Sequence, residues 1–250
     1  MPHIKALKIM KLLVVNPNTS VEMTASIGEA ARAVAAHGTE IRAVCPSFGP
    51  RSIEGHFDEA IAMAGVAEQV REAETWKPDG IVIACFGDPG LDAAREASEA
   101  PVLGIAEAAF HAASMLATGF SVITTMTRTC IMAEHLVHRY GFERKCRGIH
   151  GTDIPVLALE DRDSDVFERM VTAAQDALVK DRSGAIVLGC AGMAPACRAL
   201  QDRLGVPVID GVAAAVKFLE GLSALDLKTD KRGDYARPLP KEYVNWRGWD

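Results

Sequence analysis

Short apolar runs alternate along the chain with longer segments in which apolar residues recur every three or four positions. The short runs are rich in Val and Ile, which is typical of buried strands in a parallel sheet. The longer segments have the period of amphipathic helices. This alternation predicts an α/β fold. We expect strands at 12–15, 41–45, 81–84, 102–105, 120–124, 185–188 and 206–209, and an extended segment within 148–159. We expect helices at 23–34, 57–73, 91–98, 108–116, 131–140, 166–180, 196–204 and 213–222.

One part of this pattern occurs twice. Residues 80–90 and 184–192 are each an apolar run that ends on a cysteine, with a glycine two residues later. The repeat predicts two pseudo-symmetric α/β lobes, each with a mainly parallel sheet flanked by helices. We assign residues 10–109 and 213–250 to lobe 1, and residues 110–212 to lobe 2. Because ligands bind at the carboxyl ends of parallel strands, we expect the active site in the cleft between the lobes.

Composition narrows the possible partners. The 250 residues are 49% hydrophobic and 24% charged, with a net charge of −6 and no basic cluster, so we expect neither nucleic acid nor a membrane surface as partner. No secretory signal is evident, which predicts a cytoplasmic protein with reduced thiols. The six cysteines lack metal-type spacing with histidine, and we expect no metal. From Asp226 the chain turns polar, and we expect a tail that wraps the surface or a neighbouring subunit, with Trp246 and Trp249 packed.

The two cysteines of the repeat, Cys85 and Cys190, are the candidate catalytic residues. A single cysteine beside a buried strand is usually an inert packing residue. Here two cysteines occupy matched positions, each between a strand and the start of a helix, where the helix dipole favours the thiolate. The other four lack this context, and we interpret them as packing residues: Cys45, Cys130, Cys146 and Cys197.

Several thiol chemistries can be weighed against the sequence. A disulfide is poorly matched to a reducing compartment. A phosphatase-type cysteine needs an arginine where Leu91 and Ala196 stand, and no dinucleotide or phosphate-loop motif is present. Proton transfer remains: one thiolate removes a proton from a carbon stereocentre, and the opposite thiol returns one to the other face. With each sulfur about 3–3.5 Å from that carbon, the two sulfurs would lie about 7 Å apart.

Polar residues at the strand ends have two interpretations each. Asn16, Ser20, Thr124 and Thr125 are either helix caps or the polar rim of a substrate site. Phe86 is either core or a surface for a planar ring. Residues 52–59 are the start of a helix, the interpretation we favour, or a lid over the site. The backbone N–H groups after each cysteine are candidates to stabilise an enolate oxygen: Phe86, Gly87, Ala191 and Gly192. We expect residues 88–90 to form a turn and a helix cap. We expect a structural or surface role for the histidines His111, His135, His138 and His150.

Together the motifs resemble those of the hydantoin and allantoin racemases, within the aspartate/glutamate/hydantoin racemase superfamily. The resemblance covers residues 12 to about 227 and does not extend to the tail. It rests on Val15-Asn16-Pro17-Asn18-Thr19, Ser52-Ile53-Glu54-Gly55, Ile83-Ala84-Cys85-Phe86-Gly87-Asp88-Pro89-Gly90, Gly104-Ile105-Ala106-Glu107-Ala108, Val187-Leu188-Gly189-Cys190-Ala191-Gly192-Met193 and Pro207-Val208-Ile209-Asp210-Gly211.

The resemblance implies cofactor-independent racemisation of a 5-substituted hydantoin, with Cys85 and Cys190 as the two acid/base residues. It also implies a homo-oligomer and the substrate-binding residues Asn16, Phe86, Gly87, Thr124, Thr125, Ala191 and Gly192. The sequences of residues 85–90 and 207–211 look most like those of the allantoin racemases. The resemblance therefore favours allantoin, an intermediate of purine catabolism, over 5-alkyl or 5-aryl hydantoins. A decarboxylase or cis–trans isomerase of the same fold, needing one thiol, is an alternative. A non-catalytic two-lobed binding protein is another, and it would normally carry an export signal.

Overall fold

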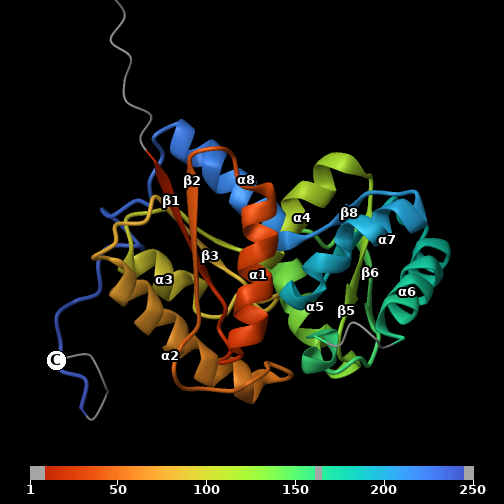
Figure 1. Cartoon of the computed structure of the whole chain (residues 1–250), viewed down its shortest axis with the longest axis horizontal. Helices are drawn as coiled ribbons and strands as arrows, with labels where there is room; N and C mark the ends of the chain where they lie inside the picture. The colour runs from red at the N-terminus through yellow and green to blue at the C-terminus, as the bar shows by residue number, and fades with distance from the viewer. Residues whose placement is uncertain (1–8, 161–164, 245–250) are drawn as a thin grey trace, which may run out of the picture.

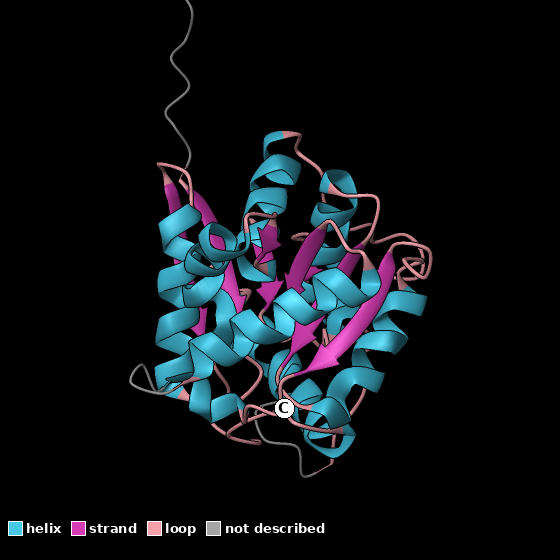
Figure 2. Ribbon diagram, turned by 90° about the vertical axis from the view of Figure 1, so that its right-hand side faces the viewer, coloured by secondary structure: helices cyan, strands magenta, loops and turns pink. Residues whose placement is uncertain are grey.

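The structure, a computed structural model, describes residues 9–160 and 165–244. It contains two four-stranded parallel sheets, with strand orders β2-β1-β3-β4 and β6-β5-β7-β8. The strands are β1 (Met10–Val15), β2 (Thr39–Val44), β3 (Gly80–Ile83), β4 (Val102–Gly104), β5 (Phe120–Thr124), β6 (Cys146–Gly151), β7 (Ala185–Leu188) and β8 (Val208–Ile209). The α-helices are α1 (Val21–Val34), α2 (His56–Ala73), α3 (Leu91–Ala97), α4 (Ile105–Leu116), α5 (Cys130–Arg139), α6 (Val166–Asp181), α7 (Cys197–Leu204) and α8 (Gly211–Ala224). Figure 1 shows the two sheets side by side, and Figure 2 shows their strands between layers of helices. The predicted α/β fold with two parallel sheets is confirmed.

The central strands β1, β3, β5 and β7 are buried on both faces, which explains their largely apolar sequences, whereas the edge strands β2 and β6 are partly exposed. In β1, Leu12 and Val14 belong to the core cluster that contains residues of α1 and α8. The alternate residues Leu13 and Val15 belong to a second cluster with α2 and α3. Because successive strand side chains point to opposite faces, an uninterrupted apolar run supplies both cores at once.

The helix that follows each sheet packs on the other half of the molecule. Helix α4 follows β4 but packs on β7, and α8 follows β8 but packs on β3 and β4. The two helices also contact each other closely, because a Cβ at Gly211 would lie 2.3 Å from the Ile105 carbonyl oxygen. Only glycine permits this approach. Our division of the chain into residues 10–109 with 213–250 and residues 110–212 stays a prediction, and its boundary after residue 109 lies inside α4.

Most predicted elements are found within two residues of their expected ends, and β5 and β7 match fully. The differences in detail lie near the ends of the strands. Helix α4 begins at Ile105, so this residue is helical and not part of the preceding strand. The segment after β7 first forms a 3-10 helix, Ala191–Ala196, and the α-helix begins only at Cys197. The region expected to be extended at 148–159 contains β6 and a 3-10 helix, Val156–Glu160.

The polar tail lies along the first half of the molecule. Of the two alternatives predicted for it, this is the one in which it wraps the surface of its own chain. The Thr229 hydroxyl donates to the Ala100 carbonyl at 2.9 Å, and the Tyr235 hydroxyl donates to Asp92 at 3.0 Å. The Lys231 ammonium donates to the carbonyl of Glu96, in the last turn of α3, at 3.1 Å. Trp246 and Trp249 lie outside the described residues. Within the described ranges, no helix is long and apolar enough to cross a membrane.

Candidate active site

The site forms where the carboxyl ends of the two central strand pairs meet. In the first sheet β1 lies beside β3, and the chain leaves these strands toward opposite edges. Such a switch in direction opens a crevice at the strand ends. Asn16 follows β1 and Cys85 follows β3 at this crevice. In the second sheet Thr124 ends β5 and Cys190 follows β7, so the same arrangement occurs twice.

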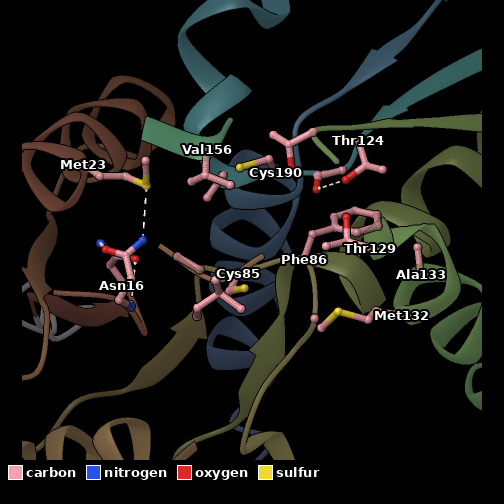
Figure 3. Close-up of a pocket in the computed structure, with 17 residues that line it drawn as sticks. Asn16, Met23, Cys85, Phe86, Thr124, Thr129, Met132, Ala133, Val156 and Cys190 are labelled. Atoms are coloured by element: carbon pink, nitrogen blue, oxygen red, sulfur yellow. Dashed lines mark hydrogen bonds between the residues drawn. The ribbon is translucent and has the colours of Figure 1, made fainter. Parts of the chain in front are cut away.

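One cavity lies between these strand ends, and both Cys85 and Cys190 line it. Figure 3 shows their sulfur atoms on opposite sides of the open space, with Asn16 and Met23 at one end and Phe86 and Met132 at the other. The remaining lining residues are Asn18, Ile53, Ala84, Gly87, Thr124, Thr125, Thr129, Ala133, Val156, Gly189 and Ala191. The cavity therefore offers two thiols, a few polar groups and a largely apolar wall.

The structure brings together eight of the nine residues predicted from the sequence: Cys85, Cys190, Asn16, Phe86, Gly87, Thr124, Thr125 and Ala191. Gly192 does not line the cavity; a Cβ there would lie 2.9 Å from Leu159 Cδ1. The sequence did not single out other residues that also line the cavity: Asn18, Met23, Ala84, Thr129, Met132, Ala133, Val156 and Gly189. Asn18 and Thr129 stand in the polar stretches after β1 and β5, so only these two carried a local signal.

The surroundings of Cys85 differ from the predicted helix start. Cys85 is followed by a turn in which the Asp88 N–H donates to the Cys85 carbonyl at 3.0 Å, and α3 begins only at Leu91. The expectation of a helix N-terminus at this thiol is therefore wrong. Asp88 and Gly90 both have left-handed backbone conformations, with φ of 45° and 70°, which interrupt any helix at this point.

Cys190 lies directly before the 3-10 helix Ala191–Ala196. The Met193 N–H donates to the Cys190 carbonyl at 3.1 Å, so the turn after Cys190 repeats the turn after Cys85. The predicted helical start is thus met on this side, by a 3-10 helix.

Burial dominates the acidity of both thiols, which are half-buried and free. Burial raises the pKa of Cys85 to about 12, the Gly87 N–H opposes this, and Cys190, Glu59 and Asp88 raise it further. Burial likewise raises the pKa of Cys190 to about 11, against the N–H groups of Gly192 and Met193 and with a further rise from Glu54. Burial therefore favours the thiol form of both cysteines, whereas a helix dipole favours the thiolate.

The polar residues at the end of β1 mainly hold the loop that precedes α1. The Asn16 amide donates to Asn18 Oδ1 at 2.8 Å and to Thr24 Oγ1 at 2.9 Å. Ser20 is the N-cap of α1, since its hydroxyl accepts from the Met23 N–H at 3.1 Å. The cap interpretation is therefore correct for Ser20, whereas Asn16 fixes the loop while lining the cavity.

On the other side of the cavity, Thr124 and Phe86 combine structural contacts with a place in the lining. The Thr124 hydroxyl donates to the Gly189 carbonyl at 3.0 Å, which ties β5 to the residue before Cys190. The Phe86 ring meets Phe110 edge-on at 5.5 Å and belongs to the main core cluster. Phe86 is thus both core and cavity wall.

The loop before α2 reaches across to the second half. Ile53 lines the cavity, and Glu54 accepts a hydrogen bond from the Val156 N–H at 2.8 Å. The Ser20 hydroxyl also donates across the halves, to Glu160 Oε1 at 2.9 Å. Residues 52–59 therefore lead into α2, which begins at His56, as favoured; of this segment, Ile53 lines the cavity.

Asp88 is a cap, but of a different helix from the one expected. Its carboxylate accepts from the N–H groups of Ala106 and Glu107, both at 3.0 Å, at the start of α4. Its other donor is the Tyr140 hydroxyl at 2.8 Å. Burial raises the pKa of Asp88 to about 7, against these three hydrogen bonds.

The remaining cysteines and the histidines lie outside the cavity lining. Cys197 Sγ contacts the Val208 carbonyl at 3.3 Å, and Cys146 Sγ contacts that of Gly148 at 3.6 Å. His150 pairs with Asp181 at 2.6 Å, and the His135 ring stacks on His56 with centroids 6.2 Å apart. Among the residues that the structure describes, no three His, Cys, Asp or Glu side chains are grouped to hold a metal ion.

Comparison with known proteins identifies the family. Residues 12–219 match the Asp/Glu/Hydantoin racemase family. A hydantoin racemase of Pseudomonas sp. (strain NS671) is 46% identical over 94% of this chain and 94% of its own. The solved allantoin racemase from Klebsiella pneumoniae is 58% identical, with a TM-score of 0.91 over 93% of this chain and 95% of that one. The allantoin racemase from Pseudomonas fluorescens is 38% identical, with a TM-score of 0.90 over 94% of this chain and 100% of that one.

More distant structures share the fold alone. Arylmalonate decarboxylase is 18% identical with a TM-score of 0.62, and the maleate isomerase from Pseudomonas putida S16 is 18% identical with a TM-score of 0.64. The family match covers nearly all of both sheets and includes both cysteines of the cavity. The chain belongs to the Asp/Glu/Hydantoin racemase family.

Proposed function

We propose that the protein is a cofactor-independent racemase of 5-substituted hydantoins, with allantoin as its foremost substrate. The observation that carries this proposal is the pair of thiols, Cys85 and Cys190, which line one cavity from matched positions in the two halves. Racemisation needs an acid and a base on opposite faces of a planar intermediate, and a repeated unit supplies both.

The reaction requires only these two groups and the substrate. The thiolate of one cysteine takes the proton from C5, and the electron pair of the broken C–H bond delocalises into the adjacent ring carbonyl as an enolate. The thiol of the other cysteine then donates its proton to the opposite face of C5. One thiol and one thiolate remain, with their places exchanged, and the product is the other enantiomer.

The surrounding groups suit this chemistry. The N–H groups of Gly87 and of Gly192 and Met193 favour the thiolate forms of Cys85 and Cys190 respectively. The backbone after each cysteine, at Phe86, Gly87, Ala191 and Gly192, is our candidate to stabilise the enolate oxygen. We propose that Asn16, Phe86, Thr124 and Thr125 hold the ring, because all four line the cavity.

The identity of the C5 substituent is a finer proposal. Allantoin carries a polar ureido group, and the 58% identity to the Klebsiella allantoin racemase favours it. Curated hydantoin racemases are 44–46% identical, which keeps 5-alkyl and 5-aryl hydantoins as the alternative. The apolar lining residues Ile53, Met132 and Val156 are compatible with those substituents.

A same-fold decarboxylase or cis–trans isomerase would use one thiol, and a two-lobed binding protein would use none in catalysis. One experiment separates all three from a racemase. A single enantiomer of allantoin, and separately of a 5-alkyl hydantoin, is incubated with the protein in D₂O. A racemase removes the optical rotation and introduces deuterium at C5. Binding without loss of rotation, or release of a different product, would refute the proposal.

The other predictions are independent of the substrate. We expect a cytoplasmic homo-oligomer that needs no added cofactor and binds neither nucleic acid nor membranes. Activity of protein purified in the presence of a chelator tests the cofactor prediction.

A further inference from the structure

The turns that carry the two thiols have the same backbone but different supports. After Cys85 the third residue is Asp88, and after Cys190 it is Met193; each donates its N–H to the cysteine carbonyl, at 3.0 and 3.1 Å. Both side chains are buried, with 2% and 1% of their surface exposed. The matched position is therefore a carboxylate in one half and a thioether in the other.

The Asp88 carboxylate is held from three directions. It accepts hydrogen bonds from the N–H groups of Ala106 and Glu107 of α4 and from the hydroxyl of Tyr140, the C-cap residue directly after α5. A Cβ at Gly104 would lie 2.1 Å from the Asp88 Cγ atom, so glycine at that position makes room for the carboxylate. Asp88 itself has a φ of 45°, a conformation that costs energy for any residue with a side chain.

In the second half, the corresponding helix has its own cap. Asp210 precedes α8 and accepts from the N–H groups of Val212 and Ala213, at 3.0 and 3.1 Å. When the Pro-Val pairs at the start of β4 and β8 are aligned, Asp210 stands where the first half has Gly104. Helix α8 is therefore capped by the residue directly before it, whereas α4 is capped by Asp88 from the turn after Cys85.

We propose that Asp88, held by Tyr140, is a positioning residue for Cys85 and has no such effect on Cys190. Asp88 does not line the cavity, so it acts through the turn and not on the substrate. The proton transfer at Cys85 then depends on the contacts of the Asp88 carboxylate, and the proton transfer at Cys190 does not. This inference rests on the proposed racemase function for its kinetic consequence, but the link between Asp88 and Cys85 stands without it.

Replacing Asp88 by asparagine tests this link, with Asp210→Asn as the matched control in the other cap. Each substitution is placed in a Cys190→Ser background, where only Cys85 exchanges the C5 proton, and in a Cys85→Ser background, where only Cys190 does. Exchange is measured in D₂O on each enantiomer. We expect Asp88→Asn to slow exchange by Cys85 about 10- to 100-fold, as a displacement near 1 Å would, and to leave exchange by Cys190 within about twofold. Asp210→Asn should not change the ratio of the exchange rate by Cys85 to the exchange rate by Cys190.

Alkylation supplies a readout that needs no substrate. Wild-type protein and both single variants are treated with iodoacetamide, and the labelling rates of Cys85 and Cys190 are compared by peptide mass spectrometry. Burial is the main cause of the raised pKa of the Cys85 thiol, and the Asp88 charge raises it further. Removing that charge and loosening the turn should make Asp88→Asn label Cys85 at least about threefold faster and leave Cys190 unchanged. Faster labelling with slower exchange identifies a thiol that is more reactive but misplaced. If Asp88 acted on Cys85 only through its charge, Asp88→Asn would speed both the labelling of Cys85 and its exchange of the C5 proton.

The outcomes are distinct. Equal effects on both cysteines, or none on Cys85, would overturn the positioning role. Wild-type protein that racemises neither hydantoin would refute the proposed function, while the labelling ratio would still decide the link to Cys85. If Asp88→Asn does not fold, Tyr140→Phe removes one of the three donors and keeps the helix cap. It should then give smaller shifts of the same sign in both assays.

Discussion

Replacing Glu54 by alanine should weaken substrate binding more than it slows the chemical step. The Glu54 carboxylate accepts the Val156 N–H at 2.8 Å, which joins the loop before α2 to the opposite half of the molecule. Ile53 and Val156 both line the cavity, so this hydrogen bond holds two walls of the site together. Without it, the closed arrangement that binds substrate is less populated, and the apparent Kd rises in proportion.

The size of this effect follows from the contact. Val156 is buried, with 5% of its surface exposed, so its N–H loses an acceptor that water replaces only when the loop opens. Leaving such a donor without a partner costs about 1–2 kcal/mol, which corresponds to about a 5- to 30-fold change in the ratio of closed to open molecules. Glu54→Gln keeps an acceptor oxygen and loses only the charge, so it should retain most of the affinity.

Polarimetry on a single allantoin enantiomer, over a range of concentrations, separates KM from kcat. We expect Glu54→Ala to raise KM more than twofold and by up to about 30-fold, with Glu54→Gln between it and the wild type. Asp58→Asn is the control in the same loop, because Asp58 accepts the Glu54 N–H at 3.0 Å without crossing to the other half. An alanine variant whose KM and kcat both stay within twofold of the wild type would refute the role of this contact in closing the site.

Because burial raises the pKa values of Cys190 and Cys85 to about 11 and 12, the thiolate base is scarce at neutral pH, and kcat/KM should rise by up to about tenfold per pH unit from pH 7 to 9; a flat profile would contradict protonated thiols at rest. Gly104→Ala should destabilise the protein by about 1–3 kcal/mol and lower its Tm by about 2–12 °C, because the new Cβ meets Asp88. Gly221→Ala is the control and should not lower the Tm, because no described atom would lie within 4 Å of the new Cβ. Light scattering after gel filtration should give a mass that is a multiple of 26.7 kDa, and a monomer would contradict the predicted homo-oligomer.

The sequence was sufficient for the parts of this site that depend on local pattern. Buried parallel strands are continuous apolar runs, so β5 and β7 were predicted with their observed ends, and the repeat pointed directly to Cys85 and Cys190. Polar residues at the end of a strand or directly after it, such as Thr124 and Asn16, were found for the same reason.

The rest depends on contacts between distant segments. Met132 and Val156 line the cavity as ordinary apolar residues of α5 and a 3-10 helix, and nothing in their local sequence separates them from core residues. The early start of α4 depends on the Asp88 carboxylate, which reaches it from another turn. The acidity of the thiols follows from their burial between the two halves, and the pattern after each cysteine indicates only the backbone.

The most direct test of two opposed thiols is C5 exchange by the single variants Cys85→Ser and Cys190→Ser in D₂O, with each enantiomer of allantoin supplied separately. We predict that both variants lose racemisation, and that each retains exchange on one enantiomer only, opposite for the two variants. Racemisation at the wild-type rate by either variant, or exchange of the same enantiomer by both, would contradict a base and an acid on opposite faces of the substrate.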